Sequence, residues 1–294
     1  MGQSAVLALF LALILAFFAP AFETRLRSLL HRRALWIWAA PPLLTAAFAG
    51  ASLLAHAFAA PLALLVLAYT AAPALCAFLQ GPGPVERPTA LDFLSILLLW
   101  LPIEFNAGAG FVPRAAQGFL HSVAYGIAIV LGLTLFLGFR SFPGLKFNLP
   151  RWKRDFWLPL AGFAILAPLL AVTGRALGFL PPPHLPVQTA GRMAGALGLI
   201  FVGTALPEEI LFRSLIQNLL TLRFGHSART LLAASLIFGC AHLDNGPQPL
   251  PNWRYMILAT IAGLVYGRVF QRASTVLSSA GLHMLVDWTK HFFF

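Results

Sequence analysis

Long apolar stretches separated by short polar segments are the main pattern of this chain. A helix of about 20 apolar residues is long enough to cross the roughly 30 Å hydrocarbon layer of a bilayer. Ten stretches are read as helices, of which eight approach or exceed this length and two, 91–104 and 230–242, are shorter. Their approximate ranges are 4–22, 34–57, 60–80, 91–104, 118–139, 156–174, 190–212, 230–242, 254–271 and 273–289.

Composition agrees with this pattern. The chain is 59% hydrophobic and 10% charged, whereas a soluble domain carries about 25% charged residues. A transmembrane β-barrel would instead show short segments of alternating polarity. We therefore predict an all-α protein, a polytopic transmembrane bundle of roughly 8–10 helices. The range 91–104 is the weakest span and is expected to be short or re-entrant, and 230–242 is expected to be partly buried in protein.

The net charge of +11 is informative because of where the basic residues lie in the sequence. Basic residues gather in short loops, which is how membrane proteins fix their orientation, and this argues against a nucleic-acid partner. All the groups follow odd-numbered segments, so these loops are assigned to the cytoplasm and the N-terminus to the outside. Glu208 is then expected near the cytoplasmic end of the seventh helix. The groups are Arg25, Arg27, Arg32 and Arg33; Arg140, Lys146, Arg151, Lys153 and Arg154; Arg213, Arg223 and Arg229; and Arg268 and Arg272.

The loop from Phe142 to Arg154, rich in basic residues and containing two prolines, is the expected boundary between two parts of the chain. The helices before it carry few polar residues, and those after it carry nearly all the candidates for chemistry. We therefore expect accessory transmembrane helices over 1–140 and a catalytic membrane domain over 155–294.

Two adjacent carboxylates, Glu208 and Glu209, lie in an otherwise apolar segment. Ionisable residues in membrane segments are costly to keep and indicate function. Arg213 is four residues after Glu209, so the two share a helix face and can pair. Glu208 is turned by about 100° from Glu209 and is free to act as a general base. The alternative is a solvated Glu-Glu pair at a helix end.

Two histidines follow in later apolar segments. His242 lies four residues after Phe238, and His283 lies four residues before Asp287. A lone histidine at a helix end is usually a polar terminus, but a His and a carboxylate on one face of a membrane helix must satisfy each other. Glu208 could take a proton from water that His242 holds. His283 and Asp287 could polarise the scissile carbonyl and stabilise its oxyanion.

A metal site is the alternative use of these residues. Glu208, His242 and His283 would supply two imidazoles and a carboxylate to zinc, with one position open. The sequence contains neither HExxH nor GxSxG. Cys76 and Cys240 lie in apolar segments without a nearby helical histidine, and they indicate no disulfide framework. Serine or cysteine catalysis is therefore disfavoured, and zinc is the one cofactor left open.

Three ordered motifs, Glu208-Glu209-x-x-x-Arg213, Phe238-x-x-x-His242 and His283-x-x-x-Asp287, resemble those of the CPBP intramembrane proteases. This family includes CAAX prenyl protease 2 and bacterial Abi and lysostaphin-resistance-type proteins. The resemblance covers roughly residues 155–290. It implies that Glu208 is the general base, that His242 positions the attacking water and that His283 stabilises the oxyanion, with Glu209 and Arg213 in support. Asp287 stands where the family often has Asn.

We therefore expect an intramembrane endopeptidase, glutamic or metal-dependent, that acts on a hydrophobic or lipidated peptide substrate. The Ala-, Leu- and Arg-rich composition is typical of bacteria, so we expect a bacterial inner membrane, a non-prenylated precursor as substrate and an active site near the cytoplasmic face. The rival interpretation is a non-enzymatic scaffold, regulator or transporter with structural or ion-binding Glu and His residues. The protease interpretation requires Glu208, His242 and His283 to converge on one water-sized pocket that opens to the cytoplasm.

Overall fold

The structure is a computed structural model that describes residues 2–246 and 249–294, and every regular element in these ranges is helical. The predicted all-α fold class is confirmed. Five helices are long and apolar enough to cross a membrane, or six if one bent pair is counted as a span. The chain folds into two compact units, Met1–Gly144 and Leu145–Phe294, which we call unit 1 and unit 2.

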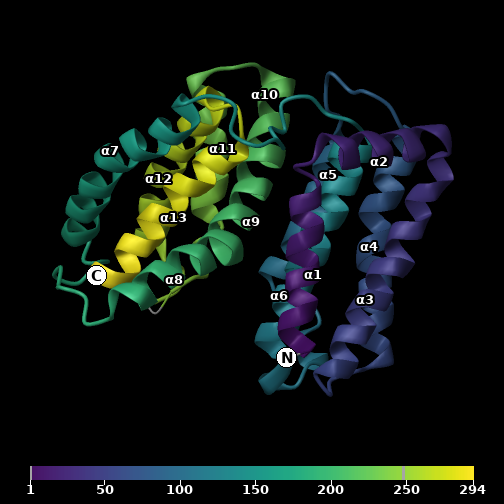
Figure 1. Cartoon of the computed structure of the whole chain (residues 1–294), viewed down its shortest axis with the longest axis horizontal. Coiled ribbons are helices and arrows are strands. Elements are labelled where there is room, and N and C mark those ends of the chain that lie inside the picture. The colour runs from purple at the N-terminus through teal and green to yellow at the C-terminus, as the bar shows by residue number, and fades with distance from the viewer. Residues whose placement is uncertain (1, 247–248) are drawn as a thin grey trace. The chain divides into compact units, whose positions relative to one another are not determined.

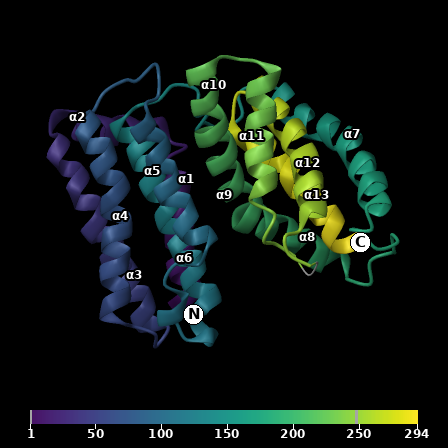
Figure 2. The same cartoon turned by 180° about the vertical axis from the view of Figure 1, so that it is seen from behind.

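Unit 1 is a helical bundle that is coloured purple to teal in Figures 1 and 2. The predicted first segment, 4–22, is broken here into two helices bent by 85°. The reason is Pro20, because a residue before proline is driven out of the helical region, and Ala19 is extended with φ −88° and ψ 116°. The elements are α1 (Gly2–Ala16), α2 (Pro20–Arg32), η1 (Ala34–Ala39), α3 (Ala40–Leu54), α4 (Ala60–Gln80), α5 (Ala90–Glu104), η2 (Ala109–Phe111), α6 (Arg114–Leu133) and η3 (Thr134–Phe139).

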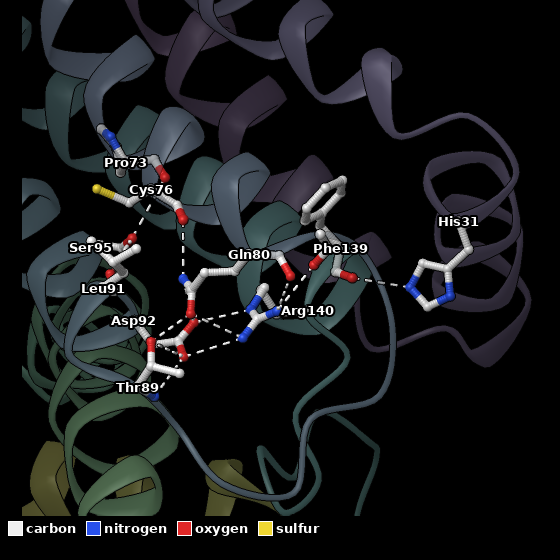
Figure 3. Close-up of polar contacts among 11 residues, drawn as sticks. His31, Pro73, Cys76, Gln80, Thr89, Leu91, Asp92, Ser95, Phe139 and Arg140 are labelled. Atoms are coloured by element: carbon white, nitrogen blue, oxygen red, sulfur yellow. Dashed lines mark hydrogen bonds and ion pairs between the residues drawn. The ribbon is translucent and has the colours of Figure 1, made fainter.

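A buried ion pair that sequence reasoning missed ties together three elements of unit 1 (Figure 3). Arg140 donates from Nε to Asp92 Oδ1 at 3.0 Å and from Nη1 to the Gly81 carbonyl at 3.0 Å. Gln80 bonds both partners, and Asp92 also completes a capping box with Thr89 at the start of α5. Since buried charges persist only when paired, this network holds together the end of α4, the start of α5 and the end of η3.

Unit 2 contains one helical segment that is much longer than predicted. It runs without interruption over 190–224, where the sequence suggested 190–212. The expected positions of Glu208 near a helix end and of Arg213 in a following loop are therefore wrong, since both lie in the middle of this segment. The elements are α7 (Arg154–Ala176), α8 (Ala190–Ile200), η4 (Phe201–Ala205), α9 (Leu206–Glu209), η5 (Ile210–Gln217), α10 (Asn218–Phe224), α11 (Ala228–Cys240), α12 (Trp253–Arg272) and α13 (Val276–Phe293).

Wider π-helical turns, η4 and η5, flank the two glutamates in this segment. Pro207 lies between them, and a proline inside a helix removes one N–H donor and crowds the carbonyl four residues earlier. A π-turn relieves such crowding, and the Leu206 N–H donates to the carbonyl of Phe201, five residues back. Such π-turns are frequent at functional sites. The residue that distorts the helix is thus the immediate neighbour of Glu208.

Helices α11 and α12 pack closely because Gly239 has no side chain. A Cβ atom at this position would lie 2.0 Å from Thr260 Oγ1 and 2.7 Å from the Met256 carbonyl oxygen. The close approach brings the end of α11 against the start of α12. It places the ring of His242, just after α11, 4.6 Å from the ring of Tyr255.

Candidate functional site

The Glu209–Arg213 pair predicted from the sequence forms the buried base of the site in unit 2. Both side chains are fully inaccessible to solvent, and Arg213 Nε donates to Glu209 Oε2 at 3.1 Å. The guanidinium carbon lies 4.6 Å from the centre of the Phe238 ring and 5.7 Å from that of Tyr266. Within the described residues the two terminal nitrogens of Arg213 have no hydrogen-bond partner. The aromatic rings therefore supply their nearest favourable contacts.

His283 lies among three carboxylates. Its Nδ1 is 3.2 Å from Glu209 Oε1, and its Nε2 is 3.4 Å from Asp287 Oδ2 and 3.9 Å from Glu208 Oε2. Ionised carboxylates only accept hydrogen bonds, so both ring nitrogens donate only when the imidazole carries both protons. The ring also stacks on Tyr266, with centroids 4.7 Å apart. His283 is thus fixed in position and orientation.

His242 lies just after α11 and is held by a backbone carbonyl of that helix. Its Nδ1 is 2.8 Å from the Phe238 carbonyl oxygen. A carbonyl can only accept, so Nδ1 carries the proton and Nε2 keeps a lone pair in the neutral tautomer. Phe238 and Tyr255 contact the ring edge to face, at 4.7 and 4.6 Å. The nitrogen that remains available is the acceptor Nε2.

Four of the predicted residues line a single cavity of about 110 Å³, namely Glu208, His242, His283 and Asp287. This volume holds a few water molecules. Glu209 and Arg213 do not reach it and lie behind His283. The convergence that the protease interpretation required is therefore present. The rest of the wall is mainly apolar, and its apolar residues are Ala167, Leu170, Ala171, Phe179, Leu180, Phe238, Leu258, Ala259, Ala262, Val286 and Phe294.

Five polar residues of this wall were not predicted from the sequence: Thr204, Tyr255, Tyr266, Thr289 and Lys290. Lys290 Nζ lies 4.3 Å from the centre of the Tyr255 ring. Lys290 could have been predicted from the sequence, because positions 283, 287 and 290 lie on one helix face. The two tyrosines are eleven residues apart, which is three turns, so they also share a face.

The formal charges of the site sum to zero when His283 carries both protons and His242 is neutral. Three carboxylates, Glu208, Glu209 and Asp287, accompany the cations Arg213 and Lys290 and the doubly protonated form of His283. Among the described residues no group of three or more His, Cys, Asp or Glu side chains is placed to hold a metal ion. Glu208, His242 and His283, the set that the sequence left open for zinc, are therefore not arranged as a ligand set.

Comparison with known proteins adds one finding. No curated protein and no solved structure gives a significant match to the chain. Residues 191–289 match the family model described as type II CAAX prenyl endopeptidase Rce1-like. This range includes all six predicted site residues. This part of the chain is thus similar to a type II CAAX prenyl endopeptidase Rce1-like domain, in agreement with the resemblance of its three motifs.

Proposed function

We propose that unit 2 hydrolyses a peptide bond inside the membrane, by attack of water without a covalent enzyme intermediate. The observation that carries this proposal is the convergence of Glu208, His242 and His283, from three separate segments, on one cavity of molecular size. A general base, a second group to position water and a donor for the oxyanion are the parts that such a reaction needs.

Glu208 is proposed as the general base. Its carboxylate lines the cavity next to His283, and it belongs to a segment distorted by Pro207. The His242 Nε2 lone pair can accept one hydrogen of a water molecule whose other hydrogen points at Glu208. The water oxygen then attacks the carbonyl carbon as its proton passes to Glu208, which later delivers that proton to the leaving amine.

His283 is proposed to stabilise the oxyanion. A hydrogen-bond donor fixed in a water-poor site is worth more than in water, since it needs no reorganisation during the reaction. Glu209 accepts from Nδ1 and holds the ring, whereas the Nε2–H, which faces Asp287 at 3.4 Å in the resting site, is shared with the oxyanion when the oxyanion forms. An ionised Asp cannot donate to an oxyanion. We therefore assign Asp287 the role of orienting His283 rather than the donor role that Asn can take.

The wall of the cavity indicates the kind of substrate. Leu170, Phe179 and Leu258 line it together with the charged groups, as expected for a site that takes an apolar segment and orients it with a few polar contacts. We propose a hydrophobic or lipidated peptide in a bacterial inner membrane as substrate, with residues 1–140 as accessory helices and 155–294 as the catalytic part.

The test is a comparison of peptide termini in membranes of host cells that carry either the wild-type chain or Glu208→Gln. We expect new termini with the wild type that vanish with the variant, because the amide cannot accept the proton of the attacking water. Identical sets of termini, with the variant inserted to the same level, would favour the scaffold or transporter interpretation.

Asp287 gives a second prediction, which separates orientation from charge. We expect Asp287→Asn to keep kcat within about 10-fold of the wild type, because an amide can hold His283 from the same place and can also donate to the oxyanion. Asp287→Leu should lower kcat by about 10²-fold. Turnover of the peptide found above, measured on purified protein, gives both values. Equal losses in the two variants would contradict the orienting role.

A further inference from the structure

The two ends of unit 2 along its helix axes differ in what they carry. At one end, Lys146 donates from Nζ to the Ala273 carbonyl at 2.8 Å, and the Ser274 N–H donates to Asp155 at 2.8 Å. The loop before α7 therefore meets the turn between α12 and α13, and Figure 1 shows α10 reaching the same end. We call this the basic end.

The opposite end is formed by the other termini of the same helices. The His184 N–H donates to the Phe293 carbonyl at 3.0 Å, and Trp288 Nε1 donates to the Met193 carbonyl at 2.8 Å. The loop after α7, the start of α8 and the end of α13 thus lie together, with the start of α12 beside them through the contact of Phe179 with Tyr255. We call this the open end.

The site cavity leads to the open end. Its lining includes Phe179, Tyr255, Lys290 and Phe294, all of which belong to that end. A second cavity of about 540 Å³ shares these four residues with it and continues to Pro181, Ala196 and Leu199. No residue of the loop 140–153 or of the turn 273–275 lines either cavity. A substrate would therefore approach from the open end.

Positive charge is concentrated at the other end. Eight Lys and Arg residues of unit 2 lie at the basic end and four at the open end. Short loops rich in Lys and Arg face the cytoplasm. The eight are Lys146, Arg151, Lys153, Arg154, Arg223, Arg229, Arg268 and Arg272, and the four are Arg175, Arg192, Arg254 and Lys290.

Unit 1, taken by itself, shows the same asymmetry more strongly. The end that holds Arg140, from which the chain leaves the unit, also carries Arg87 and the four arginines of the segment 25–33, since His31 bonds the Phe139 carbonyl and Arg140 bonds Gly81. Of the seven arginines of unit 1, which has no lysine, Arg114 is the one at the other end.

We infer that the active-site cavity opens to the non-cytoplasmic side of the membrane. The sequence suggested that the basic loops lie in the cytoplasm and that the active site lies near the cytoplasmic face. In the structure the basic loops and the opening of the cavity lie at opposite ends of unit 2, so the two expectations exclude each other. The concentration of Lys and Arg at the basic end favours the cytoplasmic assignment of the basic loops. Resting on the proposed function, the substrate is then a hydrophobic peptide segment presented on the outer side of the membrane, after export or insertion.

The test measures which side of the membrane each end faces, and it needs no enzymatic activity. Cys76 and Cys240 are first replaced by Ala in the full-length chain. Single cysteines are then placed at Leu149, at the basic end, and at Leu185, at the open end, which are 66% and 86% exposed. Thr204→Cys probes the cavity itself, because Thr204 lines both cavities. Right-side-out spheroplasts are treated with a membrane-impermeant maleimide before and after the membrane is opened.

We expect Leu185→Cys and Thr204→Cys to react in intact spheroplasts and Leu149→Cys to react only after the membrane is opened. Labelling of denatured protein gives the total for each variant and corrects for expression. Reaction of Leu149→Cys in intact spheroplasts, or protection of Leu185→Cys, overturns the inference. A labelling pattern as expected together with unchanged peptide termini would instead keep the orientation and reject the protease.

Discussion

Replacing Glu208 by Gln is expected to lower kcat by about 10²–10⁴-fold, the usual contribution of a general base, with KM changed by less than about 3-fold. The amide keeps the shape of the side chain in the cavity but has no basic oxygen for the proton of the attacking water. Initial rates on purified protein measure both constants. A loss confined to KM would mean that Glu208 binds substrate and does not act as the base.

The pairing of Glu208 with His242 gives this prediction a sharper form. His242→Ala alone should lower kcat by about 10²-fold, and the double variant with Glu208→Gln should be little slower than Glu208→Gln alone. Residues that act on one water molecule are strongly non-additive, because the second substitution removes nothing that still works. Multiplicative losses would instead mean that the two residues act in separate steps.

A matched control is available in unit 1. Glu86 lies exposed in the loop between α4 and α5, so Glu86→Gln makes the same chemical change away from the cavity. Its turnover should equal that of the wild type. A loss in this variant comparable to that of Glu208→Gln would point to a general effect of removing a carboxylate.

Sequence reasoning found most helices because hydrophobic length is a strong signal. The ranges 60–80, 156–174 and 254–271 lie within two residues of α4, α7 and α12 at both ends. It also found the Glu209–Arg213 pair and the shared face of His283 and Asp287, because four-residue spacing on a helix is a local property. These predictions needed no knowledge of tertiary structure.

Other features depended on information that the pattern does not carry. The helix was ended near residue 212 because charges such as Arg213 normally mark a membrane boundary, whereas burial against Glu209, Phe238 and Tyr266 lets this arginine stay inside. The side from which the cavity is reached depends on which helix ends meet, and this follows from packing alone. The network of Asp92 and Arg140 joins residues 48 positions apart, beyond any local spacing rule.

Arg213→Met is expected to destabilise the fold by about 3–5 kcal/mol, because it leaves the buried Glu209 with His283 as its remaining counter-charge, which Glu208 and Asp287 also contact. Both side chains are fully buried, so solvent cannot compensate. Thermal unfolding in detergent should show a midpoint lower by roughly 10 °C, taking about 2–4 °C per kcal/mol for a chain of this size. Arg229→Met, the same change at an exposed position at the start of α11, should leave the midpoint unchanged.

The double variant Glu209→Leu/Arg213→Met separates stability from activity. Removing both charges should restore much of the midpoint, since a buried ion pair can often be replaced by apolar residues without net loss. Activity should stay low, because His283 loses the acceptor at Nδ1 that fixes its ring. If the double variant unfolds as readily as Arg213→Met, then the loss lies in packing and not in the uncompensated charge. If it is both stable and active, the supporting role of Glu209 is rejected, and His283 must be held by Tyr266 and Asp287 alone.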